Sequence, residues 1–151
     1  MTLDEERVAF HLVHERWAAG DLDGVMQLFH EDVLHLINVD GFAVPYAASS
    51  YGKEDLRLRL QLVLDAFYVD KFEIESYVHE PAFSRAVAIT HKTHKKTGER
   101  LCERLRFRYW FRQGLIVRVE ENHDAPYIEA FERLVSHAGY GAQNLSPRAS
   151  G

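Results

Sequence analysis

Two carboxylates in the second half of the chain, Glu103 and Asp124, are spaced so that they could act as an acid–base pair. If Gln113 and Gly114 form a two-residue hairpin turn, antiparallel pairing places Glu103 opposite Asp124 on one face of a sheet. Burying two carboxylates together forces one pKa upward, which provides an acid and a base near neutral pH. A shift of one residue in this register would turn the whole set of side chains to the other face.

Each of these carboxylates also has an ordinary structural interpretation. Asp124 precedes a predicted helix that begins at Ala125, and aspartate is a favoured N-cap residue. Glu103 could be a solvated strand residue, or it could pair with a neighbouring arginine: Arg100, Arg104 or Arg106. Both interpretations remain open for both residues.

Further polar side chains are expected on the same side of the sheet. The assumed register places Tyr109 and Asn122 on the face that carries the carboxylates, where they could orient a carbonyl or a hydroxyl group. His35 has the same strand parity as Val33 and Ile37, so it could face the pocket or be a hydrogen-bonded core histidine.

The histidines and the cysteine do not form a metal motif. His11 and His14 are close on a predicted helix, but their surroundings match no zinc protease motif. His91 and His94 should point to opposite faces of a strand. Cys102 is the single cysteine and lies in no nucleophile motif. The sequence also lacks a glycine-rich phosphate loop, so we expect neither a metal nor a cofactor.

Length and charge restrict the class of protein. A chain of 151 residues is typical of one domain, and a net charge of -5 makes nucleic acid an improbable partner. No apolar run approaches the roughly 20 residues that cross a membrane, and no signal peptide is visible. One cysteine forms no internal disulfide, which favours the cytoplasm. The basic run at residues 91–96 is interpreted as a solvated hairpin tip.

Hydrophobic periodicity predicts helices followed by a long antiparallel meander, which is an α+β arrangement. Thr2 and Glu5 have capping-box spacing, Gly20 should end the first helix, and Asp21 should cap a short second helix. The alternation over 72–80 places Phe72, Ile74, Ser76 and Val78 on one face. The expected elements after the second helix are a strand at Val33–Val39, irregular or edge chain at Phe42–Tyr51, a helix at Lys53–Phe67, strands at Phe72–Glu80, Phe83–His94, Glu99–Phe111 and Leu115–Asp124, and a helix at Ala125–His137.

Several motifs along the chain resemble those of the SnoaL-like / nuclear transport factor 2-like superfamily, which includes the ketosteroid isomerases. They are WAAGDLDG at 17–24 with LFHEDV at 28–33, YGKEDL at 51–56, FRQGLIVR at 111–118, and ENHD at 121–124. The resemblance implies a cone-shaped, curved, mostly antiparallel sheet (cystatin-like) wrapped around N-terminal helices and a small-molecule pocket. It implies one domain at residues 1–137, followed by a poorly ordered tail at 138–151.

The resemblance also indicates which reactions are excluded. The positions that match the tyrosine and the two aspartates of ketosteroid isomerases are Val13, Ile37 and Phe107, and apolar side chains neither move a proton nor donate to an enolate. Cyclases of the superfamily use an aspartate at the end of the last long strand, a position that Asp124 matches. The implied chemistry is that of an isomerase, cyclase or hydrolase on a small apolar oxygenated substrate, with Asp124 moving the proton and Glu103 or His35 as its partner.

Aromatic and polar residues could complete such a pocket. His14 and Trp17 lie on the first helix, which often lines the cavity in this superfamily, although core packing is the alternative for both. Tyr46, Tyr51 and Tyr109 are further candidates. Relatives commonly form homodimers through the outer sheet face, where Arg106 would lie opposite Glu121, so we expect a homodimer. A non-catalytic binding or dimeric assembly domain is the alternative function.

Overall fold

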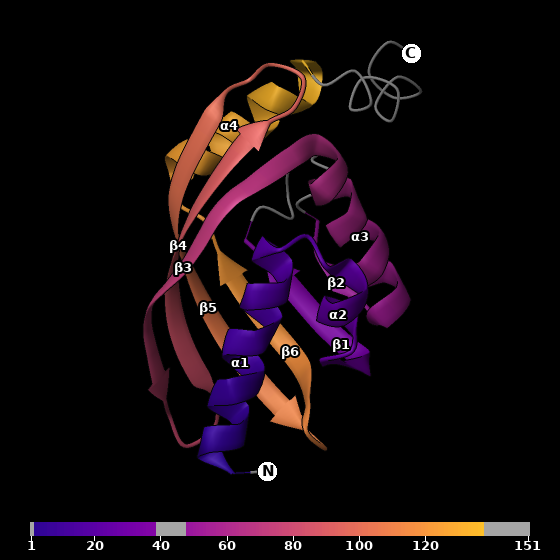
Figure 1. The fold of residues 1–151 in the computed structure, drawn as a ribbon, viewed down its shortest axis with the longest axis vertical. Helices are drawn as coiled ribbons and strands as arrows, with labels where there is room; N and C mark the ends of the chain where they lie inside the picture. Colours follow the sequence, from indigo (N-terminus) through magenta and orange to yellow (C-terminus); the bar gives the residue numbers. More distant parts are fainter. Residues whose placement is uncertain (1, 39–47, 138–151) are drawn as a thin grey trace.

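The computed structural model describes residues 2–38 and 48–137. Six strands form one curved sheet in the order β2-β1-β6-β5-β4-β3 (Figure 1). The pairing of β1 with β6 is parallel and every other neighbouring pair is antiparallel, so the mostly antiparallel sheet is confirmed. The strands are β1 (Phe29–Ile37), β2 (Ser50–Tyr51), β3 (Phe67–His79), β4 (Ser84–His94), β5 (Arg100–Arg112) and β6 (Leu115–Asn122).

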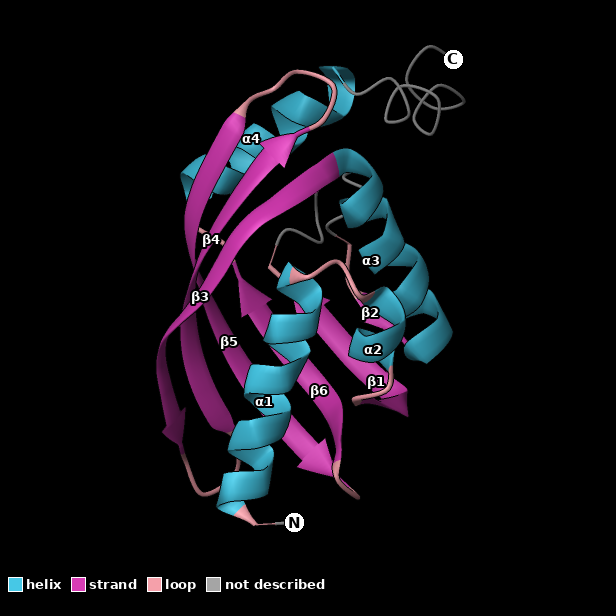
Figure 2. Ribbon diagram, in the orientation of Figure 1, coloured by secondary structure: helices cyan, strands magenta, loops and turns pink. Residues whose placement is uncertain are grey.

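Three helices lie against one side of this sheet, and a fourth packs at the end where β4 turns into β5 (Figure 2). They are α1 (Leu3–Ala18), α2 (Leu22–Met26), α3 (Lys53–Ala66) and α4 (Ala125–His137). One hydrophobic core lies beneath α1 and α2, and a second forms where the end of α3 meets α4. The predicted α+β class is therefore confirmed. The predicted tail at 138–151 lies outside the described residues.

Local side-chain chemistry explains where the first helices begin and end. The Thr2 hydroxyl accepts a hydrogen bond from the Glu5 amide, and the Glu5 carboxylate accepts one from the Thr2 amide, which confirms the capping box. Gly20 follows α1 at φ 74°, a conformation that other residues rarely adopt. The Asp21 carboxylate then caps α2 by accepting from the Gly24 amide, so the short linker turns α2 back beneath α1.

The hairpin between β5 and β6 has the predicted turn but not the predicted register. Gln113 and Gly114 both have positive φ, as in the tight turns that favour hairpins, and Phe111 lies opposite Ile116 as expected. A bulge then places Trp110 opposite Arg118, and every later pair is shifted by one residue.

This bulge corrects the predicted faces of β6. Tyr109 lies opposite Val119 rather than Arg118, and Phe107 lies opposite Glu121. Val119, Glu121 and His123 therefore face the interior, whereas Asn122 and Asp124 face outward. The predicted pairing of Glu103 with Asp124 is wrong because one extra residue in β6 reverses the alternation.

A second irregularity changes the predicted face of β3. Phe72 and Ile74 face inward as predicted, but the register shifts between Ile74 and Ser76. Tyr77 consequently packs on the core beside Phe10, and Val78 is 45% exposed. The prediction that Ser76 and Val78 share the inner face is therefore wrong.

The basic run at residues 91–96 is not simply a solvated hairpin tip. Lys92 and His94 are buried, because they continue the inward parity of Ala86 and Ala88 on β4. Phe67 and helix α4 cover this end of the strand. Lys95 and Lys96, in the turn itself, are exposed as expected.

The bulge predicts unequal contributions from two valines of β6 that an unbroken strand would place on the same face. Val119 is fully buried, whereas Val117, at the bulge, is only partly buried. Val119→Ala should lower the free energy of unfolding by about 2 kcal/mol, and Val117→Ala by less than about 1 kcal/mol. Urea denaturation measures both. Equal losses would contradict the bulged register.

Candidate functional site

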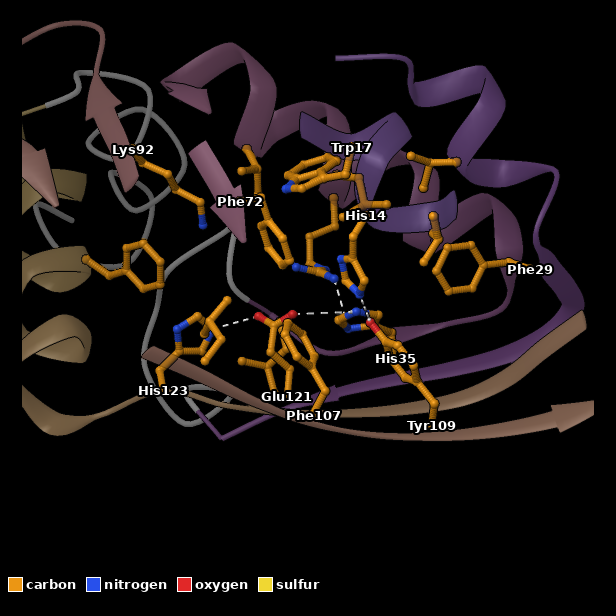
Figure 3. Close-up of a pocket in the computed structure, with 18 residues that line it drawn as sticks. His14, Trp17, Phe29, His35, Phe72, Lys92, Phe107, Tyr109, Glu121 and His123 are labelled. Atoms are coloured by element: carbon orange, nitrogen blue, oxygen red, sulfur yellow. Dashed lines mark hydrogen bonds and ion pairs between the residues drawn. The ribbon is translucent and has the colours of Figure 1, made fainter. Parts of the chain in front are cut away.

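A cavity of about 70 Å³ lies between the two cores, enclosed by α1, α3 and the inner face of the sheet (Figure 3). Most of its wall is apolar, with Trp17, Phe72 and Phe107 among the larger side chains. The volume is smaller than the roughly 300–1,000 Å³ of pockets for drug-sized ligands. Polar side chains also line the cavity: His14, His35, Arg59, Lys92, Tyr109, Glu121 and His123.

His123 bridges two glutamates beside this cavity. Its Nδ1 lies 2.8 Å from both carboxylate oxygens of Glu103, and its Nε2 lies 2.6 Å from Oε2 of Glu121. A neutral imidazole has only one N–H, so it cannot donate to both neighbours. Both ring nitrogens must therefore carry a hydrogen. An imidazolium between two carboxylates satisfies every contact.

Burial and pairing act in opposite directions on the pKa values of this bridge. Burial alone would lower the pKa of His123, but the hydrogen bonds to Glu103 and Glu121 outweigh it and raise that pKa. Burial likewise opposes ionisation of Glu121, yet the hydrogen bond and charge of His123 hold the pKa of Glu121 below its ordinary value. For Glu103 burial prevails and the pKa is raised. Glu121, the carboxylate that faces the cavity, is thus ionised at pH 7.

The end of the bridge is fixed to β1 and to α4. The Asn38 side chain donates to the carbonyl of His123 and accepts from its amide, at 2.9 and 2.8 Å. The His123 ring stacks on Tyr127 at 5.4 Å between centroids. These contacts hold the imidazole in one orientation between the glutamates.

His35 presents an N–H group to the cavity. Arg59 Nη2 lies 3.0 Å from Nδ1 of His35, and a guanidinium can only donate, so Nδ1 accepts and the ring proton is on Nε2. Burial, aided by the charge of Arg59, lowers the pKa of His35 to about 3. Nε2 lies 3.8 Å from Oε1 of Glu121, which is too far for a direct hydrogen bond. The Arg59 guanidinium is held in turn by the Ser50 hydroxyl at 3.0 Å.

A second polar pair, His14 and Tyr109, lies at the α1 side of the cavity. The Tyr109 hydroxyl is 2.7 Å from Nε2 of His14, and the His14 ring stacks on Phe72 with a centroid distance of 4.5 Å. Burial lowers the pKa of His14 to about 3 and raises that of Tyr109 well above its ordinary value. Both are therefore neutral at pH 7, and the hydroxyl donates to the imidazole.

The structure brings together only part of the predicted site. His14, Trp17, His35 and Tyr109 line the cavity, and Glu103 is buried directly behind His123. Asp124, Asn122 and Tyr51 do not line the cavity, and Tyr46 lies outside the described residues.

Asp124 and Asn122 point away from the cavity because of the bulge in β6. The Asp124 carboxylate pairs with Arg106 at 2.9 Å, and its backbone carbonyl accepts from the amides of Tyr127 and Ile128 as α4 begins. Arg106 lies opposite Asn122, so its predicted pairing with Glu121 is wrong. Tyr51 is 63% exposed, and Tyr46 lies outside the described residues.

The polar or charged cavity residues that were not among the predicted site residues are Arg59, Lys92, Glu121 and His123. Two had a signal in the sequence. Arg59 follows Leu56 by three residues and precedes Val63 by four, which places a cation on the apolar face of α3. Lys92 shares the parity of Ala88 on β4. The inward positions of Glu121 and His123 depend on the bulge, for which the sequence offers no local sign.

The outer face of the sheet carries ion pairs between strands, one of which reaches across β4 from β5 to β3. Arg104 pairs with Glu75 at 3.1 Å, and Arg108 approaches Glu120 at 3.6 Å. The outward direction of the β5 arginines is as expected. A homodimer through this face stays a prediction.

Within residues 2–38 and 48–137, no three His, Cys, Asp or Glu side chains are grouped as metal ligands would be. None of the helices in those ranges is both long enough and apolar enough to cross a membrane.

Comparison with known proteins identifies related sequences and folds. A family model described as the SnoaL-like domain matches residues 10–119. A search of curated proteins finds no match. Among solved structures, a putative isomerase from Bacillus subtilis has a TM-score of 0.73 at 16% identity, over 87% of this chain and 96% of that one.

Two further solved structures share the fold. An NTF2-like protein of unknown function from Burkholderia pseudomallei has a TM-score of 0.72 at 13% identity, over 87% of this chain and 98% of that one. A putative polyketide cyclase from Xanthomonas campestris has a TM-score of 0.69 at 17% identity, over 85% and 97%. At these identities the likeness shows the fold alone.

The lowered pKa of His14 predicts a pH dependence of stability. Folded His14 binds a proton only near pH 3, whereas the unfolded side chain binds one near pH 6.5. Between these values the unfolded chain holds more protons, so acid favours unfolding. His14→Phe removes this contribution. The free energy of unfolding should then fall less steeply as the pH is lowered, by up to about 1.4 kcal/mol per pH unit.

Urea denaturation from pH 7 to pH 4 measures this slope for the wild type and the variant. His11→Phe, on the exposed side of the same helix, controls for the loss of a histidine as such. A wild-type slope retained in His14→Phe would show that His14 is protonated in the folded protein at these pH values.

Proposed function

Because the chain belongs to the SnoaL-like domain family, we propose that its cavity is an acid–base active site for a small, largely apolar substrate that carries a carbonyl group. The observation that carries this proposal is the arrangement of Glu121 and His35. An ionised carboxylate and a neutral imidazole N–H lie 3.8 Å apart at the wall of a mostly apolar cavity.

The two groups are close enough to contact neighbouring atoms of one substrate molecule. The His35 N–H has no acceptor at hydrogen-bond distance within the described residues, so it can donate to a substrate oxygen. Glu121 Oε1 can then accept a proton from the carbon beside the carbonyl. A neutral imidazole is a suitable donor to a developing enolate because Arg59 keeps its other nitrogen an acceptor.

The remaining polar residues would support these two. Protonated His123 keeps Glu121 ionised, and Glu103 behind it balances the charge. Glu103 and His123 are therefore positioning residues in this proposal. The Tyr109 hydroxyl donates its hydrogen to His14, so its oxygen can still accept a hydrogen bond from a hydroxyl group of the substrate.

This arrangement differs from the one that the resemblance to ketosteroid isomerases implied. Val13, Ile37 and Phe107, the positions that match the isomerase residues, are apolar and all line the cavity. They favour an apolar substrate body, while the proton transfer is assigned to Glu121 and His35. The family supports acid–base chemistry in general terms, because solved structures of the same fold carry the names putative isomerase and putative polyketide cyclase.

A non-catalytic binding role is the second candidate. It is favoured by the fact that Glu103, His123 and Glu121 already satisfy one another, and by a cavity of only about 70 Å³. In that case Glu121 and His123 would stabilise the fold and the cavity would hold a small ligand without changing it. Proton exchange at a carbonyl compound distinguishes the two roles.

Cyclohexanone in deuterium oxide is a small probe that carries the required carbonyl group on an apolar body. Proton NMR follows the exchange of the hydrogens beside its carbonyl, and the protein should accelerate this exchange over buffer. Glu121→Gln should slow the catalysed exchange by about 10²-fold or more, because an amide is not a base. Glu120→Gln, on the outward face of β6 beside Arg118, is the matched control and should keep wild-type exchange.

Equal exchange in Glu121→Gln and in the wild type would assign the base to another residue. Absence of any acceleration over buffer, with folded protein, would favour the binding role for this class of compound.

A further inference from the structure

We propose that Lys92 is a nucleophile that forms an imine with a carbonyl compound bound in the cavity. The inference rests on the proposed carbonyl substrate and adds a covalent step to it. Lys92 lies on the inner face of β4 and lines the same cavity as Glu121, and its side chain extends toward the polar wall (Figure 3).

The Lys92 side chain is largely buried, and no described residue provides its amine with a polar partner. The residue is 7% exposed, and the described residues provide its side chain with neither a hydrogen bond nor an ion pair. Its Nζ lies 5.7 Å from the ring centroid of Tyr127 and 6.0 Å from that of Phe131. An ammonium group in such a site loses its hydration without a replacement, which is costly.

Burial favours the neutral form of the Lys92 amine over the charged one. Burial is the main cause that lowers its pKa; the charges of Glu103 and Glu121 oppose this effect, and that of Arg59 adds to it. With Lys92 uncharged, the cations Arg59 and His123 balance the carboxylates Glu103 and Glu121. A protonated Lys92 would leave one unbalanced positive charge in the cavity. Desolvated lysines beside another cation are suited to attack carbonyl groups.

The step balances without a further reactant. The lone pair of Nζ bonds to the carbonyl carbon, the carbon–oxygen bond breaks, and the oxygen leaves as water with the two amine hydrogens. A carbon–nitrogen double bond remains, and its protonated form withdraws electrons more strongly than the carbonyl did. A proton on the adjacent carbon is then easier for Glu121 to remove, so Lys92 would assist the same base.

Reductive trapping tests the imine directly. The full chain is incubated with cyclohexanone and sodium cyanoborohydride at pH 7, which converts an imine into a stable cyclohexyl amine, and peptide mass spectrometry locates the product. Lys92 should be modified faster than Lys71, because a lowered pKa increases the neutral fraction of an amine at pH 7. Lys71 is an exposed lysine of β3 and serves as the internal reference.

Two variants keep the test independent of folding. Lys92→Met retains the apolar stem and Lys92→Arg retains a cation, and neither forms an imine; both should lose the modification at position 92 and keep that at Lys71. Circular dichroism verifies that each variant is folded. Modification of Lys92 no faster than that of Lys71 in the wild type would overturn the proposal.

The outcome separates this inference from the proposed function. Exchange that depends on Glu121, without trapping at Lys92, would refute the imine alone. Trapping at Lys92 without catalysed exchange would support the imine and refute Glu121 as the base.

Discussion

The site depends on the pairing of buried charges where β5, β6 and α4 meet. His123 lies between Glu103 and Glu121, and both ring nitrogens need a hydrogen for those contacts to be favourable. Removing any one of the three side chains would leave a buried charge without its partner, which is strongly destabilising. The same bridge keeps Glu121 ionised at the cavity wall. One interaction therefore stabilises this part of the fold and sets the protonation state of the proposed base.

The two ends of the cavity have different electrostatic character, although both are buried. At the α1 side, His14 and Tyr109 are neutral and form a short hydrogen bond among aromatic rings. At the opposite side, Arg59 and the bridge provide charges of both signs close together. A ligand with an apolar body and one or two oxygens matches this division. The small volume favours a compact molecule over an extended one.

The fold could be predicted from the sequence because its determinants are local. Capping residues such as Thr2 and Asp21, the glycine after α1, and the hairpin turn at Gln113 each act within a few residues. The site could be predicted only in part. His35 follows simple alternation from Val33 and faces inward, but Glu121 and Asp124 exchange faces because of one bulge. That bulge arises from the pairing of two strands and leaves no mark in the hydrophobic pattern of either.

The bulge in β6 decides which alternate residues of the strand face the cavity. In the bulged register, Val119, Glu121 and His123 face the interior. In a register of the present sequence without the bulge, Arg118, Glu120 and Asn122 would face it instead. Loss of the one extra residue at the bulge would make β6 regular and would keep Val119, Glu121 and His123 facing the cavity. Alignments that permit no gap at this point would compare residues from opposite faces.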